Sequence, residues 1–202
     1  MKKLLAIIVL GLLWCNVSFA EKIKSVHGFN YEMLDEYRLL NNWNIKDSMK
    51  LADVLADDNK KKMLEAMLQQ FDMREMDILF YKDFGGDNIA ISSAKTRSDA
   101  MINDTNIEMF CDNQLKMIEG MSKKKVEQYE CSLYQNPKIS VWSVFTSYKN
   151  VFTRYPTHMY TVEFVHSTNL KKRIVLALTC GPKYCEKLLP DFYKLVSTIT
   201  FE

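Results

Sequence analysis

Four cysteines carry the most informative spacing in this sequence: Cys111, Cys131, Cys180 and Cys185. An even number of cysteines in an exported chain is typical of disulfides. The last two flank residues 181–184, whose Gly-Pro start indicates a turn, so they can join locally, which leaves Cys111 for Cys131. Sequence alone permits three pairings, and four free thiols are the alternative. We favour Cys111–Cys131 with Cys180–Cys185.

A redox role for the second pair is disfavoured by its spacing. Thioredoxin-like sites place two residues between their cysteines, so that a helix N-terminus stabilises one thiolate. Four residues separate Cys180 from Cys185, which favours a structural disulfide.

Nucleophilic catalysis would require a nucleophile, a base and an orienting group held together. Serines and acids are plentiful, but no nucleophile-elbow glycines mark any serine, and no glycine-rich nucleotide loop is present. A small cell-envelope hydrolase is the first alternative, with no catalytic residues to nominate. The sequence favours a non-catalytic protein without a cofactor.

Metal binding is the second alternative, and its ligands would be histidines or methionines. His158 and His166 lie about 26 Å apart along one straight strand, too far to chelate a single ion. A zinc site needs three or four convergent ligands, and no pair here has the usual spacing.

Methionine pairs at helical spacing could bind Cu(I) through soft thioethers. Met63 and Met67, however, share a helical stripe with leucines, which indicates a core face. We therefore assign no metal ligands. The other two pairs are Met73 with Met76 and Met117 with Met121.

Residues 1–20 have the three parts of a secretory signal. Two lysines precede an apolar run, and Ser18-Phe19-Ala20 presents small residues at the cleavage positions. The run is too short to cross a membrane of about 30 Å, and Trp14 before Cys15 disfavours lipid attachment. We expect cleavage after Ala20, export to the bacterial periplasm or beyond, and one mature domain at 21–202 with no transmembrane span.

Charge disfavours nucleic acid as a partner. Cleavage removes two lysines and no acid, so the 27 basic residues fall to 25, equal to the 25 acidic ones. A nucleic-acid binder needs a basic surplus. Basic clusters at 60–62, 123–125 and 171–173 are most simply solvated surface; if they converged, they could meet an anionic membrane or an acidic partner.

Helices are predicted by apolar residues at helical spacing. A short helix carries Leu51, Val54 and Leu55, and a stronger one runs from Met63 to Phe71. Another starts near Thr105, where Thr105 and Glu108 fit a capping box, and Gly120 would end it. The last predicted helix carries Leu188, Leu189, Phe192, Leu195 and Val196.

Strands are predicted where apolar and polar residues alternate. Two of them, 77–82 and 88–94, are joined by residues 83–87, whose adjacent glycines favour a hairpin turn. Short turns between successive strands imply a mainly antiparallel sheet covered by helices, an α+β fold. The other expected strands are 29–33, 129–133, 139–148, 159–165, 173–180 and 198–201.

The C-terminal third of the chain resembles the Mog1/PsbP-like fold. The resemblance rests on the strand 173–179, the helix after it and the closing residues 196–201, and Gly28-Phe29-Asn30-Tyr31 with Trp43 is compatible with it. It implies an exported accessory or assembly protein and supplies no active-site residues. Together, these observations predict a protein that binds another envelope component in a groove between sheet and helices.

Overall fold

The computed structural model describes residues 21–41, 75–81, 87–95, 101–122, 125–126, 128–134, 140–150, 157–166 and 169–201. Residues 1–20 lie outside the described residues. The same holds for the predicted helices around Leu51 and Met63 and for most of the hairpin turn at 83–87.

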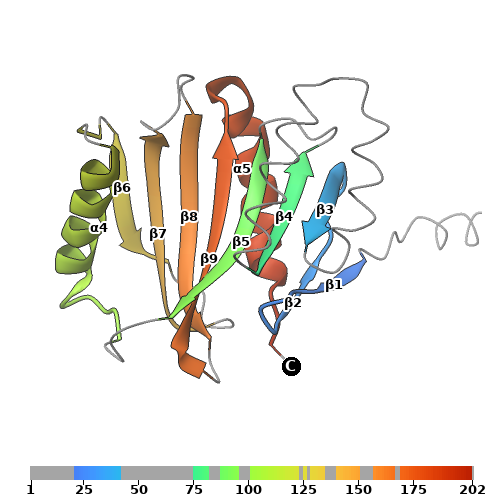
Figure 1. The fold of residues 1–202 in the computed structure, drawn as a ribbon, viewed down its shortest axis with the longest axis horizontal. Coiled ribbons are helices and arrows are strands. Elements are labelled where there is room, and N and C mark those ends of the chain that lie inside the picture. The colour runs from blue at the N-terminus through green and yellow to red at the C-terminus, as the bar shows by residue number, and fades with distance from the viewer. Residues whose placement is uncertain are drawn as a thin grey trace, which may run out of the picture.

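A seven-stranded antiparallel sheet forms the centre of the fold (Figure 1), in the order β3-β4-β5-β9-β8-β7-β6. Most of its strands arise where apolar and polar residues alternate, because successive side chains of a strand point to opposite faces. The strands are β3 (Tyr37–Asn41), β4 (Met76–Tyr81), β5 (Asn88–Lys95), β6 (Tyr129–Leu133), β7 (Ser140–Asn150), β8 (Thr157–His166) and β9 (Asn169–Cys180).

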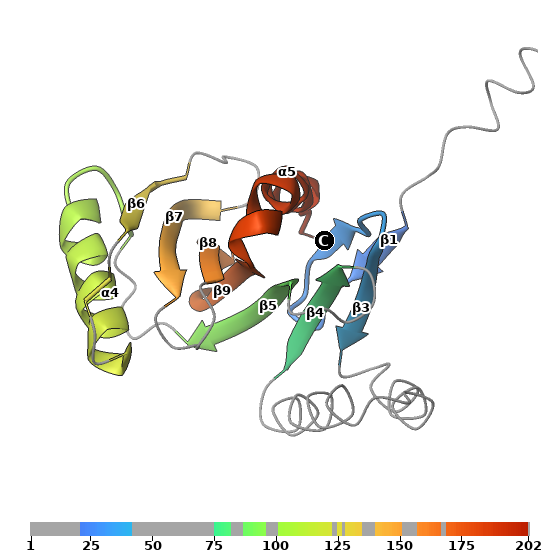
Figure 2. The ribbon, with the colours of Figure 1, turned by 90° about the horizontal axis from the view of Figure 1, so that it is seen from above.

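Helices lie against this sheet, as an α+β fold requires. Helix α5 (Pro182–Thr198) packs on β8 and β9 and on the small sheet of β1 (Lys22–Lys24) and β2 (Asn30–Glu32). Figure 2 shows α5 and β1–β2 on one side of the large sheet, and α4 (Ile107–Ser122) beside β6 at its edge. The helices and strands belong to a single domain.

The main core lies between α5 and one face of the sheet, called here the α5 face. Strand β9 contributes Ile174, Leu176 and Leu178 to it, all fully buried. The residues between them, including Val175 and Ala177, are half-buried on the opposite face. Along β9, fully buried side chains on the α5 face therefore alternate with half-buried side chains on the opposite face.

The two ends of the described chain meet over this core. Asn30 and Thr200 exchange two backbone hydrogen bonds of 2.8 Å each. Next to them, the ring centroid of Phe29 lies 6.2 Å from that of Phe164 and 6.0 Å from that of Phe201. This aromatic cluster joins β2, β8 and the C-terminus.

Two predicted features of α4 are wrong. No capping box forms at its start, because the carboxamide oxygen of Asn103 accepts hydrogen bonds from both the backbone N–H and the hydroxyl of Thr105. The helix begins two residues later, at Ile107. At the other end it continues to Ser122, so Gly120 lies inside the helix; its backbone there needs no positive φ.

The predictions around α5 need two corrections. Residues 182–184 are not a turn but the first turn of α5, because Pro182 suits the helix start and Asp87 Oδ1 accepts a 2.8 Å hydrogen bond from the Gly181 N–H. At the C-terminal end, α5 includes Thr198, and the predicted strand 198–201 is reduced to a single bridge at Thr200.

Candidate functional site

An open groove of about 520 Å³ lies over one end of β6, β7 and β8. Glu130 and Gln128 on its wall are exposed, whereas Ser147 and Tyr160 are half-buried. The groove is therefore accessible from solvent. It is lined by Gln128, Tyr129, Glu130, Ser147, Tyr148, Lys149, His158 and Tyr160.

Strand register places most of these residues in two rows across the α5 face, whereas Tyr129 and its pair Tyr148 belong to the opposite face. Glu130 pairs with Ser147, and Ser147 pairs with Tyr160, so their side chains form one row. Lys149 pairs with His158 in the next row outward, two residues or about 7 Å along the strands. Small Ser147 between larger neighbours leaves the space that forms the groove.

An aromatic wall continues the groove towards α5. Phe145 lies 6.4 Å from Tyr160 and 6.2 Å from Tyr193 of α5, centroid to centroid. Tyr134, after β6, is parallel to Tyr193 within 7° at 6.3 Å. All four rings are half-buried. Tyr160 lines the groove itself, and the other three pack beside it at α5.

The Tyr160 phenol, on the groove side of the sheet, is held neutral, because burial raises its pKa above the ordinary value of 10.0. Burial also raises the pKa of Tyr129 and of Tyr148, whose side chains belong to the opposite face. A tyrosine that acts as a general base would need the opposite shift. The ring of Tyr160 therefore offers a stacking face and a hydrogen bond to the groove, which suit binding.

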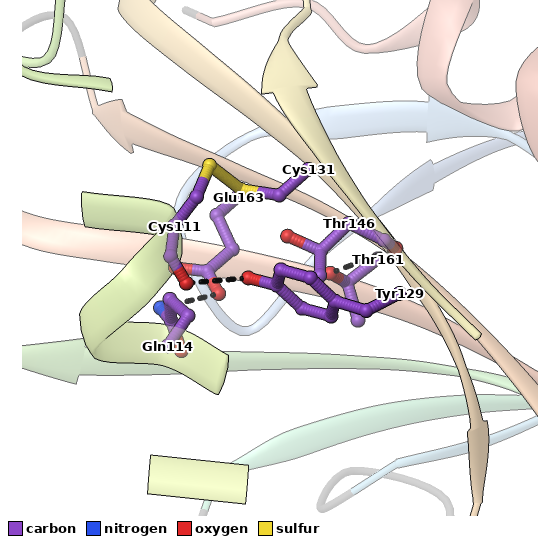
Figure 3. Close-up of a disulfide and its surroundings, with 7 residues drawn as sticks. All are labelled: Cys111, Gln114, Tyr129, Cys131, Thr146, Thr161 and Glu163. Atoms are coloured by element: carbon purple, nitrogen blue, oxygen red, sulfur yellow. Dashed lines mark hydrogen bonds between the residues drawn. A yellow bond between two sulfur atoms is a disulfide. The ribbon is translucent and has the colours of Figure 1, made fainter. Parts of the chain in front are cut away.

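A disulfide attaches α4 to the sheet behind this groove. Cys111 of α4 is bonded to Cys131 of β6, with their Cα atoms 5.7 Å apart. The hydroxyl of Tyr129 donates a 2.8 Å hydrogen bond to the Cys111 carbonyl, as Figure 3 shows. The second disulfide joins Cys180 to Cys185 at the start of α5. These are the two pairs that the sequence favours.

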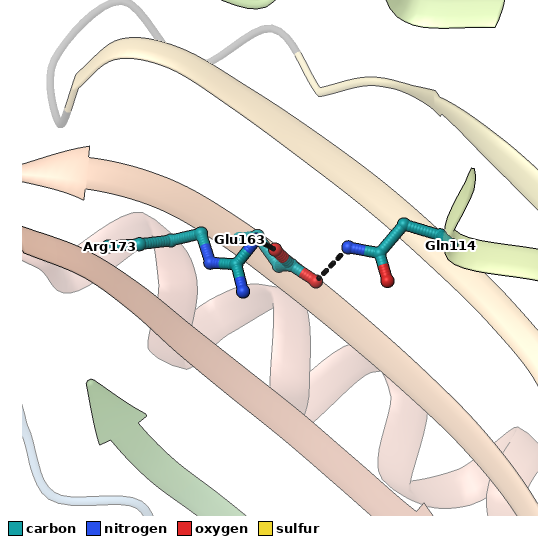
Figure 4. Close-up of polar contacts among 3 residues, drawn as sticks. All are labelled: Gln114, Glu163 and Arg173. Atoms are coloured by element: carbon teal, nitrogen blue, oxygen red, sulfur yellow. Dashed lines mark hydrogen bonds and ion pairs between the residues drawn. The ribbon is translucent and has the colours of Figure 1, made fainter. Parts of the chain in front are cut away.

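A buried acid lies under α4 on the opposite face of the sheet (Figure 4). Glu163 of β8 is 8% exposed; its Oε1 accepts a 3.3 Å hydrogen bond from Gln114, and its Oε2 lies 3.3 Å from an Arg173 nitrogen. Burial raises the pKa of Glu163, and the nearby Arg173 charge lowers it by less. Tyr129 and Tyr148, the other titratable groups near it, have pKa values that Glu163 helps to raise.

The raised pKa predicts how Glu163→Gln changes stability with pH. The contribution of Glu163 is fully present below its ordinary pKa of 4.5 and is lost as pH rises through the raised folded value. A glutamine at this position stays neutral at every pH, so the variant should gain stability relative to the native protein as pH rises above 4.5. Urea denaturation at a series of pH values measures the difference.

Exposed Glu108 on α4 supplies the matched control for this comparison. Glu108→Gln should leave the pH dependence of unfolding close to that of the native chain, because surface charges contribute little. A constant difference between the free energies of unfolding of Glu163→Gln and of the native protein from pH 4.5 upward would contradict a pKa of Glu163 raised by burial.

Ser25, His27 and Asp77 also lie close together, and their residue types match those of a serine hydrolase. Their geometry does not. Ser25 Oγ donates a 2.5 Å hydrogen bond directly to Asp77 Oδ2, and the His27 ring contacts the Ile91 carbonyl at 3.1 Å. All three residues are at most 2% exposed. This cluster therefore cannot present a nucleophile to a substrate.

Other candidate residues take structural positions. Lys172 donates a 2.8 Å hydrogen bond to the His27 carbonyl, so the basic cluster 171–173 makes internal contacts through this lysine and through Arg173. His158 and His166 both lie in β8, eight residues apart. Within the described ranges, no three His, Cys, Asp or Glu side chains are grouped to hold a metal ion. Nor is any helix there long and apolar enough to cross a membrane.

Residue patterns along the chain do not reveal the groove. Its lining comes from three strands, and each strand alone looks like an ordinary half-buried strand. One usable signal exists: Ser147 is a small residue on the face that carries Phe145, where strand packing usually needs bulk.

Comparisons with known proteins add a likeness in fold. No protein-family model matches the sequence, and no curated protein matches it. Among solved structures, cyanobacterial PsbP (CyanoP) from Synechocystis aligns with a TM-score of 0.55 and 10% sequence identity, covering 93% of this chain and 96% of its own. This structural similarity covers far more of the chain than the C-terminal third, on which the sequence resemblance rests. The chain therefore has a PsbP-like α+β fold.

Proposed function

We propose that this chain is an exported, non-catalytic accessory protein that binds a partner protein of the cell envelope through the groove over β6, β7 and β8. The observation that carries the proposal is the groove itself: accessible, about 520 Å³ in volume, and bordered by the neutral phenol of Tyr160 with the ring of Phe145 beside it. Aromatic surface with a polar rim is typical of binding sites.

Two further observations support export. Residues 1–20 have the pattern of a secretory signal. Both disulfides, Cys111–Cys131 and Cys180–Cys185, are of the kind that persists in an oxidising compartment. The PsbP-like fold agrees with an accessory role. No observation on the described residues favours the hydrolase or the metal-binding alternative.

Photo-crosslinking in the cells that make the protein tests the proposal. A benzoylphenylalanine replaces Gln128, which is exposed on the groove wall, and in a matched strain it replaces Lys116, which is exposed on α4. We expect a discrete protein adduct from position 128 and none from position 116. Equal labelling at both positions, or no adduct at position 128, would overturn the assignment of the groove.

A further inference from the structure

We infer that the groove receives a cationic side chain, arginine or lysine, from the partner polypeptide. This inference rests on the proposed function and specifies its chemistry. The residues that carry it are Glu130 and Tyr160, which lie in one row of the groove, with Glu186 and Tyr193 on the neighbouring helix α5.

Two carboxylates supply the negative charge. Glu130 on β6 and Glu186 on α5 are both exposed, and Glu130 has no hydrogen bond or ion pair through its carboxylate within the described part of the chain. Its charge nevertheless reaches the groove, because it helps to raise the pKa of both Tyr160 and Tyr193, after the larger effect of burial. Glu186 acts on Tyr160 in the same way.

Aromatic faces supply the second attraction. A guanidinium or ammonium group is attracted to the electron-rich face of a tyrosine ring within about 6 Å of its centroid. Tyr160 and Tyr193 are both in contact with Phe145, which holds their rings in place.

The positive charge of Lys149 lies in a different row. Lys149 pairs with His158 across β7 and β8, about 7 Å outward from the row of Glu130 and Tyr160. Lys149 already takes part in an interaction of its own. A cation from the partner therefore fits best on the inner row, and Lys149 in the outer row orients the partner by repelling its positive groups.

Peptide titration followed by NMR tests the inference on the purified, oxidised protein. The probe is the blocked tripeptide acetyl-Gly-Arg-Gly-amide, and the control replaces arginine with citrulline, which has nearly the same shape and no charge. We expect the arginine peptide to shift the ring resonances of Tyr160 and Tyr193 and to bind at least about fivefold more tightly than the citrulline peptide.

Two variants locate the effect. Glu130→Gln, on an exposed side chain, should weaken binding of the arginine peptide by about twofold to fivefold and leave the citrulline peptide unaffected. Glu108→Gln on α4 should change neither. Equal binding of the two peptides, or a Glu130→Gln variant that binds arginine like the native protein, would overturn the inference.

Failure of this inference can be told apart from failure of the proposed function. If neither peptide binds while position 128 still forms its adduct in cells, the groove binds a partner that is not recognised through a cation. If both measurements are negative, the proposed function fails as well.

Discussion

Phe29→Ala is expected to lower the free energy of unfolding by about 3–5 kcal/mol, the usual cost of truncating a buried phenylalanine. Phe29 is 1% exposed and contacts the rings of Phe164 and Phe201. Its removal leaves a cavity where β2, β8 and the C-terminus meet. Urea denaturation monitored by circular dichroism measures the loss.

Tyr184→Ala is the control for this prediction. Tyr184 is 52% exposed near the start of α5, so its truncation should change stability by no more than about 0.5 kcal/mol. Equal losses in the two variants would show that the aromatic cluster does not hold the ends of the chain together.

Replacing Cys111 and Cys131 together with serine is expected to lower the free energy of unfolding by about 3 kcal/mol under oxidising conditions. The bond closes a loop with a sequence separation of 20, and its loss frees the unfolded chain. It also removes the covalent attachment of α4, which should become the first site of cleavage in limited proteolysis.

The second disulfide provides the comparison. Cys180 and Cys185 have a sequence separation of 5, so their double serine variant should lose only about 2 kcal/mol by the same loop-entropy argument. Its α4 should stay resistant to protease. A larger loss for this short loop, or protease resistance of α4 without Cys111–Cys131, would contradict the role assigned to the long-range bond.

Sequence patterns predicted most of the sheet because burial on one face imposes alternation. Strands β4, β5 and β6 lie within about a residue of the expected ranges, while β7, β8 and β9 run longer than expected. Strand β3 (Tyr37–Asn41) was not predicted, because Leu39 and Leu40 are adjacent and both face packed surfaces. Such a strand lacks alternation.

Features that depend on contacts between distant residues were the ones that patterns missed. The capping box at Thr105 failed because Asn103 competes for the same hydroxyl. Gly181, the residue before α5, donates its N–H to Asp87, 94 residues away in sequence. The groove belongs to the same class, since strand pairing brings Glu130, Ser147 and Tyr160 into one row, and no local pattern reports that pairing.

The most direct test of the groove is to fill it. Ser147→Trp should block the space between Glu130 and Tyr160, and Asn113→Trp on the exposed side of α4 is the matched bulky change. With the photo-crosslinker at position 128, Ser147→Trp should abolish the cellular adduct, and Asn113→Trp should leave it intact, both proteins being exported with two disulfides. A full yield of adduct from Ser147→Trp would contradict binding in this groove.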